Sequence, residues 1–305
     1  MTEIENKEEA PVSDRLVGSS APYRGIACMV AGGALLTAND AILKWLTGGY
    51  PVGQIMFLRG LFVFVMVAYL VWRAGGLVSL RVVRFRGHLV RAGLVVGGTF
   101  MFVTGLSLLP LADAIAISFA GPLFVTALAP VMLGEHVGWR RWAAVLVGFV
   151  GVLVMIRPTG EAVQWAALLP LAASLTGALR DILTRGMSGR ESSVAILFVS
   201  TSAVCLGGLA TAPFGWSPVT MPDIGLFALA GLVLGGAHFL LIETFRFAEA
   251  ALVAPFKYSN MIWAVALGFF IWGDLPDRWT IGGAAFVICS GLYILHRESV
   301  RGRPL

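Results

Sequence analysis

The sequence predicts an all-α integral membrane protein with ten transmembrane helices, and three observations lead to this prediction. Hydrophobic residues make up 58% of the 305 residues and 37 glycines add to them, whereas charged residues make up only 13%. The apolar residues form runs of about twenty, the length that crosses a bilayer as a helix. The basic residues gather on alternate connections between these runs. A soluble fold could not bury so much apolar surface, so soluble enzymes are excluded.

Ten segments are long and apolar enough to span a hydrocarbon core of about 30 Å. Long continuous runs, such as residues 225–236, argue against a membrane barrel, whose strands are about ten residues long and alternate strictly. The ten predicted spans cover residues 25–46, 52–73, 88–109, 112–133, 139–157, 162–185, 193–213, 223–246, 249–272 and 279–296.

The two ends of the chain are expected to be short polar tails, at residues 1–24 and 298–305. The first tail is acidic, whereas a secretory signal begins with positive charge and has a cleavage site after its apolar core. We therefore expect a solvated leader before the first span and a basic tail after the last.

The distribution of lysine and arginine predicts the orientation. With the N-terminus inside, sixteen of the 22 basic residues, Arg91 among them, fall on the inner side, and only Arg157 and Arg278 fall outside. Both termini are therefore predicted to be cytoplasmic, in a multi-pass protein of the inner membrane. Because the charges are spread over separate short loops, they form no basic face for nucleic acid. Four basic residues remain inside spans: Lys44, Arg59, Arg180 and Lys257.

The two halves of the chain repeat each other at an offset of about 140 residues. Residues 38–44 in the first span align with residues 178–184 in the sixth, and Trp139 is matched by Trp279. The repeats are predicted to be residues 25–158 and 159–297. Each contains five spans, an odd number, so the second half enters the membrane from the opposite side. Inverted halves of this kind are typical of secondary transporters that work by alternating access.

Several short motifs follow one another in a characteristic order: Phe57-Leu58-Arg59-Gly60, Leu109-Pro110-Leu111-Ala112-Asp113-Ala114, Pro122, Gly134-Glu135, Gly148-x-x-Gly151 and Arg157-Pro158. In this order and with this topology, residues 25–297 resemble the drug/metabolite transporter superfamily, in its ten-helix EamA-like branch. The resemblance implies secondary transport of small organic solutes, often export, with amino acids, related metabolites or drugs as substrates. Met261 and Asp274 depart from the family pattern, so the two halves are not expected to supply equivalent groups.

Lys257 is the leading candidate for a substrate contact, because an ionisable side chain inside a span costs a few kcal/mol. It lies about eight residues into the ninth span, beside the polar residues Tyr258 and Ser259. It could face a substrate carboxylate or compete for a proton. Alternatively it could pair with Glu243 or Glu249, or extend to the membrane surface.

The fourth span is expected to face the ninth across a central cavity. Pro122 removes a helix hydrogen bond and leaves a carbonyl that substrate, water or a neighbour can meet. When the two halves are aligned, Ser118 and Phe119 match Lys257 and Tyr258. Other aromatic side chains in the third and ninth spans would form part of the cavity wall. The predicted substrate-binding residues are Lys257, Tyr258, Ser259, Trp263, Ser118, Phe119, Pro122 and Phe100.

Other charges within the spans are candidates for ion coupling or for structure. Asp40 precedes Lys44 by four residues on one helix face, which predicts an intrahelical pair. Arg59 cannot release its proton, so it is expected to lock helices through Asp40 or Asp113, or else to hold a carboxylate.

His238 and Glu243 in the eighth span are the candidates for proton binding. Their structural alternatives are a hydrogen-bonded packing histidine and an ion pair of Glu243 with Arg246. Arg180 and Asp181 are expected to anchor the inner end of the sixth span.

The predicted function is export of small zwitterionic or amphipathic metabolites, with amino acids favoured. A multidrug, nucleoside or other metabolite transporter of the same fold is the alternative, and a membrane-embedded enzyme a weaker one. The sequence contains no HExxH, GxSxG or GxxxxGK[ST] pattern, so we expect no enzyme, ATP-driven pump, metal or cofactor. Proton antiport and facilitated diffusion both remain open. The expected partners are the substrate and the bilayer, and the oligomeric state is undefined, with a monomer compatible.

Overall fold

A computed structural model describes residues 22–82, 85–134, 137–156, 165–187, 192–248 and 250–301. Several sequence predictions concern residues outside these ranges. They are most of the N-terminal tail, Glu135, the Arg157-Pro158 motif with the boundary between the halves, Glu249, and the end of the C-terminal tail.

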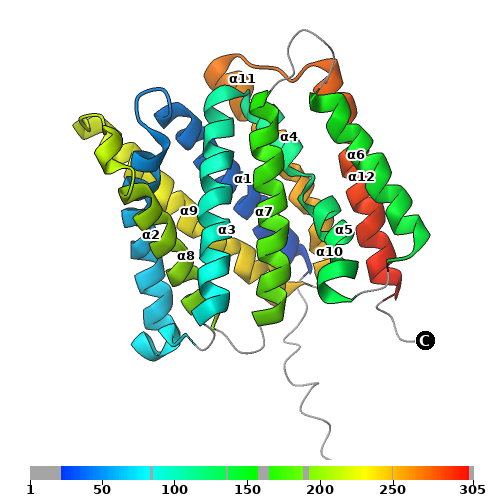
Figure 1. The fold of residues 1–305 in the computed structure, drawn as a ribbon, viewed down its shortest axis with the longest axis horizontal. Coiled ribbons are helices and arrows are strands. Elements are labelled where there is room, and N and C mark those ends of the chain that lie inside the picture. The colour runs from blue at the N-terminus through cyan, green and yellow to red at the C-terminus, as the bar shows by residue number, and fades with distance from the viewer. Residues whose placement is uncertain are drawn as a thin grey trace, which may run out of the picture.

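Every regular element within the described residues is helical, and the helices form one bundle (Figure 1). Among the described residues, nine helical segments are long and apolar enough to cross a membrane, so the predicted total of ten spans stays a prediction. The predicted all-α membrane class is therefore confirmed. The elements are α1 (Pro22–Leu46), α2 (Val52–Arg73), η2 (Gly76–Leu80), α3 (Phe85–Leu108), α4 (Leu111–Ser118), α5 (Gly121–Leu133), α6 (Trp139–Ile156), α7 (Trp165–Met187), α8 (Ser193–Leu209), η3 (Ala212–Phe214), α9 (Met221–Phe247), α10 (Ala250–Val253), η4 (Ala254–Ser259), α11 (Asn260–Trp272) and α12 (Arg278–Arg301).

Two of the predicted spans are interrupted. The fourth consists of α4 and α5, separated by a turn at residues 119–120, with Pro122 in the first turn of α5. The ninth, expected as one span over 249–272, consists of α10, the 3-10 helix η4 and α11. Pro255 lies in the first turn of η4, and proline has no N–H to continue an α-helical ladder.

The main helix contacts join the first half of the chain to the second. Helix α1 packs on α9, α3 on α7, α2 on α8, and α6 on α12, while α4 packs against α11. If each helix is replaced by its counterpart in the other half, the contact of α1 with α9 becomes the contact of α7 with α3. The contacts α2–α8, α6–α12 and α4–α11 remain the same pairs under this replacement. An inverted repeat would produce this pattern.

Glycines permit the closest of these contacts. A Cβ on Gly151 of α6 would lie 2.6 Å from the carbonyl oxygen of Gly283 in α12, and a Cβ on Gly283 would lie 2.5 Å from that of Gly151. Likewise, a Cβ on Gly208 of α8 would lie 2.5 Å from the carbonyl oxygen of Gly53 in α2. These glycines bring the backbones of neighbouring helices into direct contact.

The start of α1 and the end of α12 lie at the same end of the bundle (Figure 1). At the opposite end, hydrogen bonds connect the start of α2 with the segment before α9. The Tyr50 hydroxyl donates to Asp223 at 2.6 Å, and the Gln54 side chain both donates to and accepts from the backbone of Ser217, at 2.8 and 2.9 Å. These bonds link the two halves where α1 ends.

Candidate functional site

The 3-10 helix η4 and the first residue of α11 carry a cluster of polar groups that have no hydrogen-bond partner among the described residues. Lys257 is exposed and forms no hydrogen bond or close ion pair within the described residues. The Tyr258 hydroxyl, the Ser259 hydroxyl and the Asn260 Oδ1 are buried and likewise have no hydrogen-bond partner in that part of the chain. Because an unsatisfied buried polar group costs about 1–3 kcal/mol, these atoms are suited to bind water or a ligand.

The interrupted spans meet at an aromatic contact. The rings of Phe119 and Tyr258 are 5.1 Å apart between centroids and inclined at 72°, an edge-to-face arrangement. This places the fourth and ninth spans next to each other, while the predicted cavity between them stays a prediction. The Ser118 hydroxyl, in contrast, donates to the Ala114 carbonyl at 2.8 Å within its own helix.

A charged pair on α7 lies near Lys257. The Nε and Nη2 of Arg180 donate to one carboxylate oxygen of Asp181, at 2.9 and 2.7 Å, and the two side chains are 38% and 55% exposed. Both residues are within electrostatic range of Lys257. The sequence suggested an anchor for the sixth span at this position, and in the structure the two side chains bind each other.

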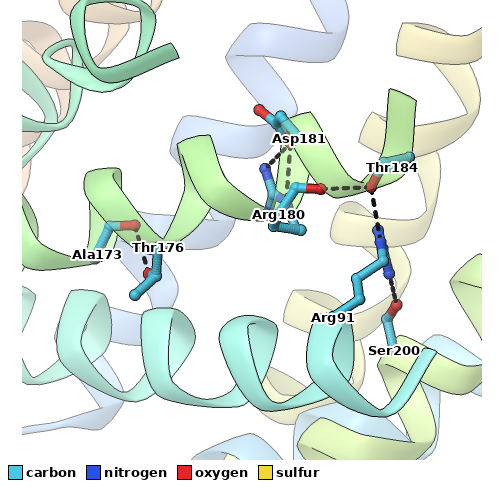
Figure 2. A network of polar contacts seen from close by, with 7 residues as sticks. All are labelled: Arg91, Ala173, Thr176, Arg180, Asp181, Thr184 and Ser200. Atoms are coloured by element: carbon cyan, nitrogen blue, oxygen red, sulfur yellow. Dashed lines mark hydrogen bonds and ion pairs between the residues drawn. The ribbon is translucent and has the colours of Figure 1, made fainter. Parts of the chain in front are cut away.

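Arg91 extends this network to two more helices, as Figure 2 shows. From α3, its Nε donates to the Thr184 hydroxyl at 2.9 Å, and its Nη1 donates to the hydroxyl of Ser200 on α8. The Thr184 hydroxyl in turn donates to the Arg180 carbonyl at 2.7 Å. The sequence interpretation assigned Arg91 to orientation alone. Its position three residues inside the predicted third span was the signal that it also belongs to the interior.

The predicted pair of Asp40 with Lys44 does not form. The Lys44 Nζ donates to the carbonyl oxygens of Leu106 and Leu109 at 3.2 and 2.5 Å, and it lies 5.3 Å from the ring centroid of Trp272. The last carbonyls of a helix lack intrahelical donors and lie at the negative end of its dipole, so α3 attracts the ammonium group. Asp40 accepts from the Asn39 side chain at 3.1 Å instead.

Arg59 is buried in α2, with only 6% of its surface exposed. It lies within electrostatic range of Asp40, one of its two expected partners, but its Nη2 donates to the Met56 sulfur at 3.4 Å. Its Nε has no hydrogen-bond partner among the described residues. Its assignment as a helix lock or a carboxylate site therefore stays a prediction.

The remaining candidates lie on separate helices. His238 contacts the Leu234 carbonyl of α9 at 3.0 Å through Nδ1, as expected for a packing histidine, and lies within range of Arg59 and Arg180. Glu243 is partly buried further along α9. Phe100 faces Gly207 of α8, where an added Cβ would lie 3.9 Å from its ring. Pro122, Trp263, Phe100, Glu243 and His238 therefore keep their proposed roles as predictions.

Comparison with known proteins identifies the family. Residues 23–157 match the EamA-like transporter family. The chain is 30% identical to a riboflavin transporter of Rhizobium johnstonii, over 92% of this chain and 93% of that protein. The chain belongs to the EamA-like transporter family. This confirms the predicted membership, and with it a small-molecule transporter that crosses the membrane several times.

Other relatives have different named substrates. An S-adenosylmethionine uptake transporter of Rickettsia bellii is 29% identical, over 86% of this chain and 90% of its own length. A pseudopaline exporter of Pseudomonas aeruginosa is 24% identical, over 87% of this chain and 93% of its own length. A crystal structure with 18% identity superposes with a TM-score of 0.63, covering 91% of this chain and 99% of its own, which supports the fold.

Proposed function

We propose that this protein is a secondary transporter of small zwitterionic metabolites in the cytoplasmic membrane. The substrates would be amino acids or metabolites that contain an amino-acid group. The observation that supports this most directly is the exposed Lys257, which lies on an interrupted span within electrostatic range of Arg180 and Asp181.

The local chemistry suits a zwitterion. Lys257 would bind the substrate carboxylate, and Asp181 would attract its ammonium group while keeping its bond to Arg180. The hydroxyls of Tyr258 and Ser259 would supply further hydrogen bonds, since both lack partners within the described residues. Interrupted helices that expose polar groups are the usual way in which transporters of this architecture build a site.

Alternating access would follow from ten crossings arranged as two inverted five-helix halves. Each interrupted span would count as one crossing. The reciprocal packing of α1 on α9 and α7 on α3 supports this arrangement. Most basic residues of the connecting segments fall at the end of the bundle where α1 starts and α12 ends. This excess supports cytoplasmic termini.

One group of relatives supports an amino-acid group as the recognised part. S-adenosylmethionine, the substrate named for the Rickettsia bellii relative, carries an α-amino carboxylate. The relatives include proteins named for uptake and for export, so their names do not indicate the direction of transport by this protein. Export remains our prediction from the family resemblance.

A flat aromatic metabolite is the second candidate. The edge-to-face contact of Phe119 with Tyr258 and the 37% exposure of Trp263 would provide aromatic surface for it. The riboflavin transporter of Rhizobium johnstonii supports this candidate.

Counterflow into liposomes that contain the purified protein tests both candidates. Labelled amino acids, S-adenosylmethionine and riboflavin are compared, each with and without a pH gradient. We expect exchange of a compound with an amino-acid group, reduced in Lys257→Met and retained in part by Lys257→Arg. Exchange of riboflavin alone would favour the second candidate, and exchange of no compound above empty liposomes would contradict both.

The driving force is tested in the same preparation. If protons are coupled through α9, a pH gradient should accelerate exchange, and His238→Ala or Glu243→Gln should remove that acceleration while counterflow at equal pH persists. Equal rates with and without the gradient in the unmodified protein would indicate facilitated diffusion.

A further inference from the structure

A second polar site lies away from η4, where α6 begins and α12 ends. A cavity of about 230 Å³ is lined there by Gly138, Trp139, Arg140, Arg141 and Arg297. Its two walls come from α6 and α12, one helix from each half of the chain, so that Arg141 and Arg297 meet across 156 residues of sequence. Three of its five lining residues are arginines, which present planar groups of donors that match phosphate oxygens.

The geometry around the cavity adds to its preference for an anion. The α6 helix is 18 residues long, and its first turn forms part of the lining. Backbone N–H groups of that turn and the helix dipole favour negative charge at this position. The cavity is smaller than the roughly 300–1,000 Å³ that encloses a drug-sized ligand, so it suits a phosphate group better than a whole metabolite.

The surroundings indicate a membrane surface. Trp139 is 75% exposed and Arg140 lies 5.4 Å from its ring centroid, while Trp142, one turn further along α6, is also exposed. Exposed tryptophans beside arginines are typical of the layer where lipid headgroups meet water. The cavity lies at the end of the bundle that the basic residues assign to the cytoplasm, where anionic lipids bind basic pockets between helices.

We propose that this cavity binds the phosphate group of an anionic phospholipid of the inner leaflet. The phosphate would contact Arg297 of α12 together with Arg140 and Arg141 of α6, and its acyl chains would extend along the exposed side of α6. A bound lipid would connect α6 and α12 at their inner ends, beyond the glycine contact of Gly151 with Gly283.

Thermal unfolding of the detergent-purified full chain tests the proposal, with phosphatidylglycerol, phosphatidylcholine or inorganic phosphate added in turn. We expect phosphatidylglycerol to raise the Tm in a saturable way, and phosphatidylcholine and inorganic phosphate to leave it unchanged. Arg297→Gln should weaken the apparent affinity about fivefold, and Arg140→Gln/Arg297→Gln about 25-fold, since each basic residue near an anionic surface contributes about a factor of five.

Arg81→Gln is the matched control. Arg81 is exposed after η2 at the same end of the bundle, outside the cavity, so its removal changes the net charge equally but should leave the affinity within twofold. Native mass spectrometry of phosphatidylglycerol adducts provides a second readout that does not depend on the Tm. Equal weakening by Arg81→Gln and Arg297→Gln would overturn a specific site. A Tm increase with inorganic phosphate that Arg297→Gln removes would overturn the lipid assignment in favour of a soluble phosphate.

Discussion

The fourth and ninth predicted spans are both interrupted, yet their polar groups lie in different surroundings. Around the first interruption, most residues from Leu111 to Ala120 are buried, and the Ser118 hydroxyl bonds to its own helix. Around the second, Lys257 is exposed, and the side-chain oxygens of Tyr258, Ser259 and Asn260 lack partners among the described residues. The first interruption therefore supplies packing, and we infer that the second supplies the chemistry of the site.

The helix type accounts for part of this difference. The first span returns to an α-helix directly after a two-residue turn. The second passes through six residues of 3-10 helix, which turns every three residues and changes the direction of each side chain relative to an α-helix. In that stretch the hydroxyls of Tyr258 and Ser259 find no hydrogen-bond partner among the described residues.

The largest expected effect is on transport in Lys257→Met. Losing the charge that would hold the substrate carboxylate should lower the initial counterflow rate about thirtyfold or more, since removing one partner of a desolvated charge pair costs about 2 kcal/mol or more. Lys257→Arg keeps the charge and should retain part of the rate. If Lys257→Met transports every tested substrate at the unmodified rate, the second interruption does not carry the substrate contact.

Phe119→Ala tests the packing role of the first interruption. Phe119 is buried against Tyr258, and removing such a ring typically destabilises a protein by about 3–5 kcal/mol. The measurement is equilibrium unfolding in mixed micelles with increasing SDS. Tyr258→Phe keeps the ring and removes only a hydroxyl without a partner, so its stability should not decrease. Equal losses in the two variants would remove the contrast between the interruptions.

Gly291→Ala introduces a smaller disturbance at the second interruption. A Cβ on Gly291 of α12 would lie 2.9 Å from the Cζ of the Tyr258 ring and closer still to its hydroxyl, so the ring must move. We expect about 1–3 kcal/mol of destabilisation, as for other overpacked positions, together with slower transport. Gly282→Ala on the same helix meets nothing within 4 Å and serves as the control. A stability loss in Gly282→Ala equal to that in Gly291→Ala would point to helix α12 itself rather than to Tyr258.

Ser118→Ala should have the smallest effect. Ser118 matches Lys257 under the repeat, but its hydroxyl bonds to the Ala114 carbonyl of its own helix. Replacing it should change stability by no more than about 0.5 kcal/mol and leave counterflow within twofold. A large loss of transport with normal stability would show that both interruptions contact the substrate, which would favour a symmetric site.

Hydropathy and short motifs alone were enough to predict the membrane class, the approximate positions of most spans, the family and the proximity of the fourth and ninth spans. These follow from hydropathy, which is local, and from prolines and repeats that can be read along the chain. It also singled out Lys257 as unusual, because a charge inside an apolar run is visible without any structure.

The contacts between polar side chains could not be read from the sequence. The sequence paired Lys44 with Asp40, whereas the structure pairs it with the carbonyls at the end of α3. The sequence left Arg180 and Asp181 as an anchor and Arg91 as an orientation signal, whereas the structure joins them in one network near Lys257. The physical reason is that a long charged side chain finds its partner through the rotation and tilt of neighbouring helices, which hydropathy and spacing do not specify.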